Sequence, residues 1–336
     1  MKIAILGAGS WGVALAKLLT CNQHEVVLWS IDPEEVAMLT EYCEHKLKLP
    51  GVILPGTVHY TGEMETALSD AEMVVMAVPS PFVRSTSKAA APLVKDGTVI
   101  VSVAKGLEEN TLLRLSEVIS EEIPQADVAV LSGPSHAEEV GKCLATIVVV
   151  GAKTHETARL VQDVFMTDFF RVYTSPDMVG IEIGAALKNV IALAAGIADG
   201  LGCGDNTKAA LITRGILEIS NLGTKLGGHP ETFSGLSGTG DLIVTCASKH
   251  SRNRRAGVLI GQGMSYHDAM NEVKMIVEGV YSAKAALELA KKHDVVMPIV
   301  EMVNRVLFDD FPAADALKSL LTRDRKSEIS GMNWDD

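Results

Sequence analysis

A glycine-rich motif at the start of the chain restricts the possible fold more than any other feature. Gly7, Gly9 and Gly12 form the sequence GAGSWG. The motif directly follows the apolar run Lys2–Leu6 and opens the helical pattern Ser10–Cys21. In such a turn the first glycine permits the sharp bend, the second admits a pyrophosphate, and the third allows close helix–strand packing. The helix N-terminus then offers N–H groups and partial positive charge to the pyrophosphate. This context predicts a dinucleotide-binding Rossmann unit, with a purely structural glycine turn as the alternative.

The first half of the chain alternates short apolar runs with helical patterns. Runs such as MVVMAV and TVIVSV have no polar interruption, which is typical of strands covered on both faces. We expect strands at Lys2–Leu6, Glu25–Trp29, Met73–Val78, Thr98–Val103, Val128–Leu131, Ala145–Val150 and Phe170–Tyr173. We expect helices at Ser10–Cys21, Pro33–Thr40, Pro81–Ala91, Leu112–Glu122, Ala137–Gly141 and His155–Phe165. The alternation predicts an α/β fold with a doubly wound, mostly parallel sheet.

After about Pro176 the strand signals fade and helical patterns follow one another. We expect helices at Met178–Asp199, Thr207–Leu226, Asn253–Gly261, Tyr266–Asn271, Gly279–His293, Pro298–Leu307 and Ala313–Leu321, with another short one beginning at Asp241. A chain of 336 residues is long for one core. The sequence therefore predicts a dinucleotide-binding domain over residues 1–177 and an all-α substrate and catalytic domain over 178–336, with a loose tail at 330–336.

Composition excludes several classes of partner. The formal net charge of −12 argues against nucleic acid or an anionic membrane surface. The five cysteines are far apart, and no CxxC or HExxH occurs, so we expect neither disulfides nor a metal site. The most apolar stretch, residues 179–201, carries charged residues and is a poor membrane-spanning candidate. With no signal-peptide pattern at the N-terminus, we expect a cytoplasmic protein without membrane insertion.

Two positions follow predicted strands and are candidates for ligand contact. Asp32 lies 20 residues after Gly12, where an acidic side chain would bind ribose hydroxyls and favour NAD over NADP. Because Pro33 follows it, Asp32 is equally suited to cap a helix. Lys105 comes at the carboxyl end of a strand, where ligands bind in such sheets, although a surface lysine is the usual case. The loop containing Gly133 and Ser135 also follows a strand, and its N–H groups could face the same crevice.

Lys188 is the strongest candidate for acid–base chemistry. It lies in GAALKNVIALAAG, a helical segment too apolar for the protein surface. Burial and a nearby Lys105 would both lower its pKa towards neutrality. Such a lysine can exchange a proton with a substrate alcohol or carbonyl. The alternative is a lysine whose stem is buried at the edge of a helix bundle while its ammonium reaches water.

The segment Lys249–Arg255 is the strongest basic cluster in this acidic chain. Ser251 would cap the helix that begins there, and Arg252 and Asn253 would lie in its first turn. A helix start with arginine favours phosphate binding. The alternatives are a solvated run of charges and a nucleic-acid patch, although no aromatic residues are interleaved.

Two acidic residues have weaker signals. Asp241 would either cap its helix or bind a substrate hydroxyl and orient Lys188. Glu278 precedes Gly279, and an isolated glutamate of this kind is usually on the surface.

These residues, taken in order, resemble the bacterial NAD(P)-dependent sn-glycerol-3-phosphate dehydrogenases over almost the full chain. The similar segments are GAGSWG (7–12), AKGLE (104–108), SGPS-x-AEE (132–139), GAALKNVIALAAGIADGLG (184–202), ALITRG (210–215), SGTGDLIVTC (237–246), SRNRR (251–255) and VEG (277–279). KNVIA together with GDLIVTC and SRNRR is specific to this family, whereas GxGxxG alone is not. The resemblance implies a cytoplasmic enzyme, often dimeric, that reduces dihydroxyacetone phosphate reversibly to sn-glycerol 3-phosphate with NAD(P)H and so supplies phospholipid synthesis.

The resemblance also implies roles for individual residues. Lys188 would be the catalytic proton donor and acceptor, and Lys105 would contact both substrate and cofactor. The other implied substrate contacts are Gly133, Ser135, Asp241, Ser251, Arg252 and Asn253. The implied cofactor contacts outside the glycine motif are Ser10, Trp11, Ala137, Arg252, Ile276 and Glu278.

The chain departs from the family pattern at two positions. Many relatives carry His or Arg where this chain has Ile31, which weakens the case for a cationic contact to the NADP 2′-phosphate. His136 stands where relatives often have Phe, and its role is open.

Two alternative functions remain open from the sequence. One is a dehydrogenase for hydroxy or sugar acids, in which SRNRR would bind a carboxylate. The other is a non-catalytic dinucleotide sensor, which has no need of Lys188.

Overall fold

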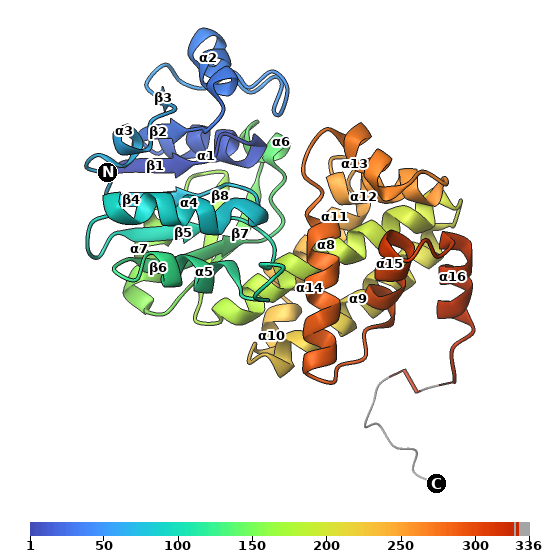
Figure 1. The fold of residues 1–336 in the computed structure, drawn as a ribbon. Helices are drawn as coiled ribbons and strands as arrows, with labels where there is room; N and C mark the ends of the chain where they lie inside the picture. The colour runs from blue at the N-terminus through green and yellow to red at the C-terminus, as the bar shows by residue number, and fades with distance from the viewer. Residues whose placement is uncertain (326, 329–336) are drawn as a thin grey trace.

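A computed structural model describes residues 1–325 and 327–328, so the expected tail at 330–336 lies outside the described residues. The N-terminal part is built on an eight-stranded sheet in the order β3-β2-β1-β4-β5-β6-β7-β8 among these residues (Figure 1). Its strands are β1 Lys2–Leu6, β2 Glu25–Trp29, β3 His59–Thr61, β4 Met73–Met76, β5 Val99–Ser102, β6 Asp127–Ser132, β7 Thr146–Ala152 and β8 Phe170–Ser175. The strand order reverses beside β1, which is the place where doubly wound sheets bind dinucleotides.

The pairing of the strands confirms the mostly parallel sheet. Every neighbouring pair is parallel except β6 and β7, which are antiparallel with Leu131 opposite Val150. The expected strands are present to within about two residues at their ends. The short edge strand β3 was not expected, because three residues of the sequence HYT show no apolar period.

Helices cover both faces of the sheet, as the unbroken apolar runs predicted. Side chains from alternate strand positions form two separate cores. One core includes Ile5 and Val75 and packs against α1 (Ser10–Cys21) and α7 (His155–Phe165). The other includes Leu6 and Val74 and packs against α3 (Met64–Leu68), α4 (Val83–Ala90) and α5 (Leu115–Glu122). The remaining helical elements of this part are α2 Pro33–Tyr42, η1 Ser80–Phe82, η2 Ala91–Leu93 and α6 Ala137–Val140.

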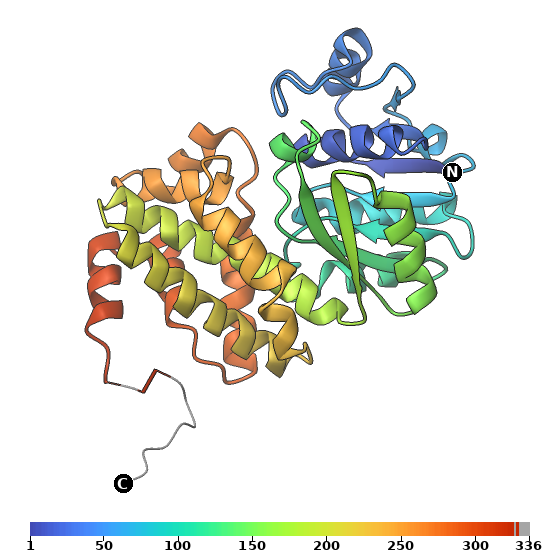
Figure 2. The ribbon, with the colours of Figure 1, turned by 180° about the vertical axis from the view of Figure 1, so that it is seen from behind.

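Beyond β8 the described chain is helical, which confirms the expected all-α part (Figure 2). Its elements are α8 Met178–Gly200, α9 Asp205–Lys225, α10 Pro230–Phe233, η3 Leu236–Gly240, α11 Asp241–Ala247, α12 Arg252–Gly261, α13 Tyr266–Val273, α14 Glu278–Lys292, α15 Pro298–Phe308 and α16 Ala313–Leu321. Neither α10 nor the π-helical turn η3 was expected.

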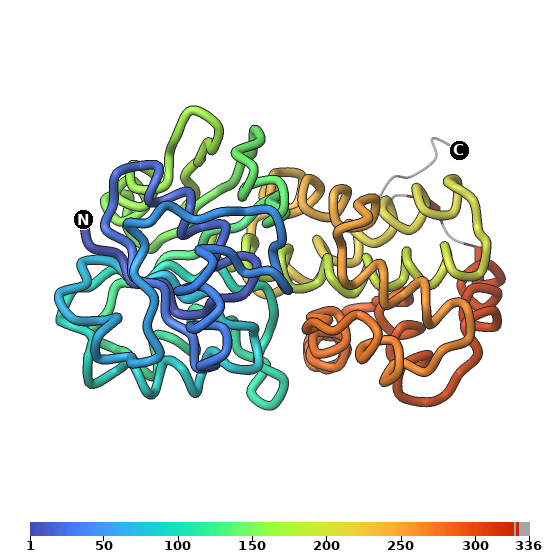
Figure 3. Tube along the Cα trace, turned by 90° about the horizontal axis from the view of Figure 1, so that it is seen from above, coloured from blue at the N-terminus to red at the C-terminus, as the bar shows by residue number. Residues whose placement is uncertain are grey.

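The long helix α8 is the axis of this part and also joins it to the sheet (Figure 3). Met178 and Ile181 in its first turns pack against Val130 and Val149 of the sheet. Its later turns form the centre of a second large core with α9, α12, α14 and α15. Lys188 lies near the middle of α8, between these two contacts.

The contact between α8 and α12 depends on glycine. A Cβ atom built on Gly196 would lie 2.2 Å from the Arg254 carbonyl oxygen, and one on Gly257 would lie 2.3 Å from the Leu193 carbonyl oxygen. Both distances are far inside van der Waals contact, so the two backbones approach more closely than any side chain would allow. This approach fixes the start of α12 relative to Lys188.

Candidate active site

A cleft of about 420 Å³ separates the carboxyl edge of the sheet from the helical part. It brings together most of the residues that the sequence singled out. Those that line it are Gly9, Ser10, Trp11, Lys105, Ser135, Ala137, Lys188, Asp241, Ser251, Arg252, Asn253, Ile276 and Glu278. Gly7, Gly12, Asp32 and Gly133 do not line it. Candidate residues from both halves of the sequence therefore share one cavity.

The glycine motif has the geometry of a pyrophosphate cradle. Gly7 has φ +119°, and its Cβ would lie 2.8 Å from the Ala77 backbone, while a Cβ on Gly12 would lie 1.9 Å from the Gly7 oxygen. These two glycines are needed for the turn and the packing. A Cβ on Gly9, in contrast, would meet nothing within 4 Å and would only fill the open cradle. The first turn of α1 has no side-chain cap, and the Trp11 indole N–H is buried without a partner in the described chain. The residues present thus suit a bound dinucleotide.

Asp32 caps helix α2, as one of its two interpretations predicted. Its carboxylate accepts a hydrogen bond of 2.9 Å from the Glu34 N–H, and Pro33 occupies the first turn. Capping uses one carboxylate oxygen and leaves the exposed side chain able to bind a ribose as well, so the cofactor role stays a prediction. The neighbouring Ile31 is 82% exposed, and its side chain carries no positive charge for a cofactor phosphate.

A buried charge network lies at the centre of the cleft. The Asp241 carboxylate accepts a hydrogen bond of 2.7 Å from Lys105 Nζ and lies 3.1 Å from Lys188 Nζ. Lys188 also donates to the Thr245 hydroxyl at 2.7 Å, and Lys105 donates to the Gly133 carbonyl at 3.0 Å. One carboxylate therefore holds two lysines that come from the sheet edge and from α8.

The network contradicts the capping interpretation of Asp241. Gly240 is the N-cap of α11, and Asp241 is the first residue inside the helix with its side chain 2% exposed. Its partners lie 136 and 53 residues away in the sequence, at Lys105 and Lys188. The contact with Lys188 agrees with the other interpretation, in which Asp241 orients that lysine.

Burial controls the protonation of this network. Burial is the largest influence on Lys188 and, with the positive charge of Lys105, lowers its pKa to about 8 against the opposing attraction of Asp241. Burial alone would raise the pKa of Asp241, but Lys105 and Lys188 outweigh it and hold that pKa below its usual value. Lys188 is therefore close to its titration point near neutral pH while Asp241 remains ionised. This combination suits a group that gives and takes a proton.

The start of α12 forms another wall of the cleft. Ser251 is the N-cap, and its hydroxyl accepts a hydrogen bond from the Arg254 N–H at 3.2 Å. The Asn253 amide is held in place, because it donates to Asn189 Oδ1 at 2.9 Å and accepts from the Gly279 N–H at 2.8 Å. Arg252 makes no hydrogen bond or ion pair with the residues that the structure describes, and its guanidinium stays available for an anion.

The basic cluster does not act as one unit. Arg254 forms an ion pair of 2.7 Å with Asp199 on α8 and so fixes the helix contact. Arg255 lines the cleft near Arg252. Only part of the cluster is therefore positioned to hold an anionic substrate group.

Glu278 connects the two parts of the molecule, and the expectation of a surface position was wrong. Its carboxylate accepts hydrogen bonds from the Ser80 N–H and hydroxyl, which follow β4. Burial raises the pKa of Glu278 despite these bonds. The first turn of α14 is thereby tied to the loop beside the glycine motif, with Ile276 next to it in the cleft.

Several cleft residues were not singled out from the sequence. Thr245 and Asn189 hold Lys188 and Asn253 in place, and Lys48 and Lys274 add positive charge to the cleft wall. Thr245 lies four residues after Asp241, so the two side chains share one face of α11. This spacing could have identified Thr245 as a neighbour of Asp241 from the sequence. Lys48 and Lys274 lie in segments without a recognisable motif.

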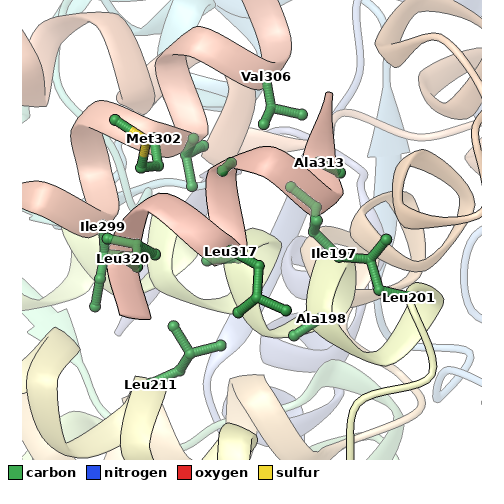
Figure 4. Close-up of a pocket in the computed structure, with 13 residues that line it drawn as sticks. Ile197, Ala198, Leu201, Leu211, Ile299, Met302, Val306, Ala313, Leu317 and Leu320 are labelled. Carbon is green, nitrogen blue, oxygen red and sulfur yellow. The ribbon is translucent and has the colours of Figure 1, made fainter. Parts of the chain in front are cut away.

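Other features of the described chain are weaker candidates for an active site than this cleft. A partly open pocket of about 40 Å³ between α8, α9, α15 and α16 is lined only by apolar side chains, among them Leu211, Met302 and Leu317 (Figure 4). Helix α8 is long and apolar enough to cross a membrane by length and composition, but its apolar window is wholly buried within the protein. Within residues 1–325 and 327–328 no group of His, Cys, Asp and Glu side chains is arranged to hold a metal ion.

Comparisons with known proteins point to one family. The family model for the NAD-dependent glycerol-3-phosphate dehydrogenase N-terminus matches residues 2–158, and the model for the C-terminus of the same enzymes matches residues 177–318. A glycerol-3-phosphate dehydrogenase [NAD(P)+] from Agathobacter rectalis is 60% identical over 333 residues, covering 99% of each chain. One from Bacillus subtilis is 50% identical over 334 residues, covering 98% of this chain and 97% of the relative. The crystal structure of glycerol-3-phosphate dehydrogenase from Coxiella burnetii superposes with a TM-score of 0.93 at 36% identity, covering 96% of this chain and 99% of the other.

Proposed function

The chain belongs to the family of NAD-dependent glycerol-3-phosphate dehydrogenases, and from that premise we propose that Lys188 exchanges the proton in its reaction. The protein is an NAD(P)-dependent oxidoreductase that reduces dihydroxyacetone phosphate reversibly to sn-glycerol 3-phosphate. The observation that carries the proposal is the position of Lys188. Its ammonium is buried in the cleft, 3.1 Å from an ionised carboxylate and with a pKa near neutrality.

A bound nicotinamide cofactor would supply the hydride that C2 of the substrate takes up. The protein supplies orientation and proton transfer. Lys188 donates a proton to the oxygen on C2 in the reductive direction and accepts it in the reverse direction. Lys105 stabilises negative charge on the same oxygen, and Asp241 keeps both lysines directed at one point. This arrangement needs no metal ion to polarise the carbonyl.

The phosphate of the substrate is assigned to the start of α12. The Arg252 guanidinium and the N–H groups of the first turn after Ser251 face the cleft, and the helix dipole favours an anion there. Asn253 contributes through its backbone, because its amide is engaged with Asn189 and Gly279. Ser135 completes the substrate wall beside Lys105, and Gly133 contributes from behind it through the carbonyl that holds Lys105. Binding energy from the phosphate then positions C2 for reaction.

The cofactor is assigned to the glycine motif and the residues around it. Gly7, Gly9 and Gly12 with Ser10 and Trp11 would hold the pyrophosphate. The remaining proposed contacts are Lys105, Ala137, Arg252, Ile276 and Glu278. Asp32 would bind the adenosine ribose, and together with Ile31 it favours NAD over NADP.

Other properties follow from the family and the fold. We propose that residues 1–177 and 178–336 are separate domains that share the cleft, because the sheet ends at Ser175 and α8 begins at Met178. We further propose that the enzyme is a cytoplasmic homodimer without membrane insertion and that its product supplies phospholipid synthesis. The apolar window of α8 is buried in the helical core, which supports a protein that does not enter the membrane.

The test is an assay of purified protein with dihydroxyacetone phosphate, run in parallel with NADH and NADPH and followed by the absorbance of the reduced nicotinamide. We expect rapid oxidation, faster with NADH. If protein that binds the cofactor oxidises neither, the activity is wrong, and a panel of hydroxy acids is the next set of substrates. Faster oxidation of NADPH would contradict the assignment of Asp32 and Ile31.

A further inference from the structure

His136 lies in the cleft but has no part in the mechanism so far. It is the N-cap residue of α6, between Ser135 and Ala137, and its side chain lines the cleft together with those of Lys105 and Lys188. Its ring nitrogen Nε2 is buried and has no hydrogen-bond partner among the residues that the structure describes. A buried polar atom without a partner is costly unless a ligand completes it. The position of the atom in a ligand cleft points to a missing contact of that kind.

The surroundings of His136 indicate which group of the substrate it meets. Its ring centroid lies 6.1 Å from that of His250, the residue before the Ser251 cap of α12. His136 therefore lies beside the wall that was assigned to the phosphate. That wall offers the Arg252 guanidinium and the Ser251 hydroxyl, which accepts from the Arg254 N–H and keeps its own O–H for a ligand. The imidazole of His136 adds a donor from the sheet side of the cleft.

The charges around His136 support this assignment. Burial lowers the pKa of His136, and Lys188 and Lys105 lower it further, while Glu138 and the Val244 carbonyl raise it. Glu138 also lies 3.9 Å from His250 Nδ1. Before the substrate binds, burial and the two cations together favour the neutral imidazole. A phosphate dianion brought close to it would offset those cations and favour the protonated ring.

We propose that His136 donates a hydrogen bond to the phosphate of the bound substrate and so acts as a positioning residue that selects phosphorylated substrates. The inference rests on the proposed function, since it assumes a phosphoester in this cleft. His136 does not touch the proton or the hydride that is transferred. Its effect is therefore confined to binding energy that depends on the phosphate group.

The kinetic test compares His136→Gln and His136→Phe with the wild-type enzyme on two substrates, dihydroxyacetone phosphate and unphosphorylated dihydroxyacetone. We expect kcat/KM for the phosphorylated substrate to fall about 10- to 100-fold, mainly through KM, since a hydrogen bond to a charged group is lost. The rate with dihydroxyacetone should stay unchanged. His155→Gln, at an exposed position on α7, is the matched control and should behave as wild type on both substrates.

The second test does not use turnover. The imidazole of His136, assigned in NMR spectra by its absence from His136→Gln, is titrated with and without inorganic phosphate as the probe. We expect phosphate to raise the pKa of that ring and to leave the pKa of His155 unchanged. An unchanged His136 titration, or an equal loss on both substrates in the kinetic test, overturns the inference. Failure of the wild-type enzyme to reduce dihydroxyacetone phosphate would instead overturn the proposed function.

Discussion

The Asp241 carboxylate lies 3.1 Å from the Lys188 ammonium, and both side chains are buried at the base of the cleft. The pair is not a simple ion pair, because Lys105 binds the same carboxylate at 2.7 Å. Three charges thus share one site with a net charge of about +1 when all are ionised. Loss of a proton from Lys188 leaves the site neutral, which makes that loss easy near neutral pH.

Replacing Asp241 with Asn should shift the pH dependence of the reaction. In the reductive direction Lys188 must be protonated, so turnover falls as pH rises through its pKa, which is about 8. The amide of Asp241→Asn removes the negative charge that raises this pKa. We therefore expect the fall in kcat to move to lower pH by about one pH unit, with a lower maximum rate. The profile of kcat against pH, measured with saturating substrate, checks this.

Asp163→Asn is the control for that experiment, because Asp163 is exposed on α7, away from the cleft. Its profile should coincide with that of wild type. A profile of Asp241→Asn that keeps the wild-type midpoint would show that Asp241 does not control the protonation of Lys188.

Removal of the Lys188 amine should abolish most of the turnover. We expect Lys188→Ala and Lys188→Met to lower kcat by about 100- to 10,000-fold, the usual value of a positioned general acid. The Met variant keeps most of the buried apolar side chain and removes only the amine. It therefore distinguishes the loss of proton transfer from the loss of packing in the core. NADH affinity, measured by fluorescence titration, should be retained because Lys188 lies on α8 and not at the glycine motif. Near-normal turnover in both variants would remove Lys188 from the mechanism, and Lys225→Ala, exposed on α9, should behave as wild type.

Glu218 should make the protein less stable as pH rises. It is buried, and although its carboxylate accepts hydrogen bonds from the Ile299 and Val300 N–H groups, burial raises its pKa to about 7. A carboxyl whose pKa is higher in the folded state stabilises the fold at low pH and loses this stabilisation as pH rises through about 4.5 to 7. Between pH 5.5 and 8 we expect wild type to lose about 2 kcal/mol relative to Glu218→Gln.

Denaturant titrations of wild type and Glu218→Gln at the two pH values measure that difference. Glu231→Gln, at an exposed position on α10, controls for the loss of a carboxylate. If the stability difference between Glu218→Gln and wild type does not change with pH, Glu218 is already ionised at the lower pH.

The main architecture followed from local sequence signals, for physical reasons. Strands such as β4 are unbroken apolar runs, and α1 and α7 begin and end where the pattern of residues indicated. The elements that the sequence did not predict are short or lack a periodic pattern of apolar residues. The edge strand β3 is defined by pairing with β2, and η3 is a glycine-rich turn whose shape depends on its contacts.

The site was predictable only in part. Lys188 could be singled out because a lysine in an apolar helix needs a partner, but the identity of that partner could not be read locally. Asp241 illustrates the limit: the sequence left open whether it caps its helix or orients Lys188, and only its contacts with Lys105 and Lys188 exclude the cap. The hydrogen-bonded amide of Asn253 and the cleft positions of Lys48 and Lys274 could also be identified only from the coordinates.

The glycine contact between α8 and α12 should determine both stability and substrate binding. Gly196 and Gly200 on α8 meet Gly257 and Gly261 on α12, and a Cβ on any of the four would lie 2.2 to 2.3 Å from a backbone oxygen of the other helix. In Gly257→Ala the new methyl group would clash with the backbone of α8. Backbone atoms cannot move aside as a flexible side chain would, so the two helices must separate. We expect a loss of about 1–3 kcal/mol, seen as a lower Tm.

The same substitution should weaken substrate binding without weakening cofactor binding. Helix α12 carries Ser251 and Arg252 at its start, so its displacement moves the phosphate wall away from Lys188 on α8. We expect KM for dihydroxyacetone phosphate to rise while the affinity for NADH, which depends mainly on the glycine motif, changes little. Gly56→Ala is the control, because a Cβ there meets nothing within 4 Å, and it should leave Tm and KM unchanged. A Gly257→Ala enzyme with the Tm and KM of wild type would show that α12 can move without moving the site.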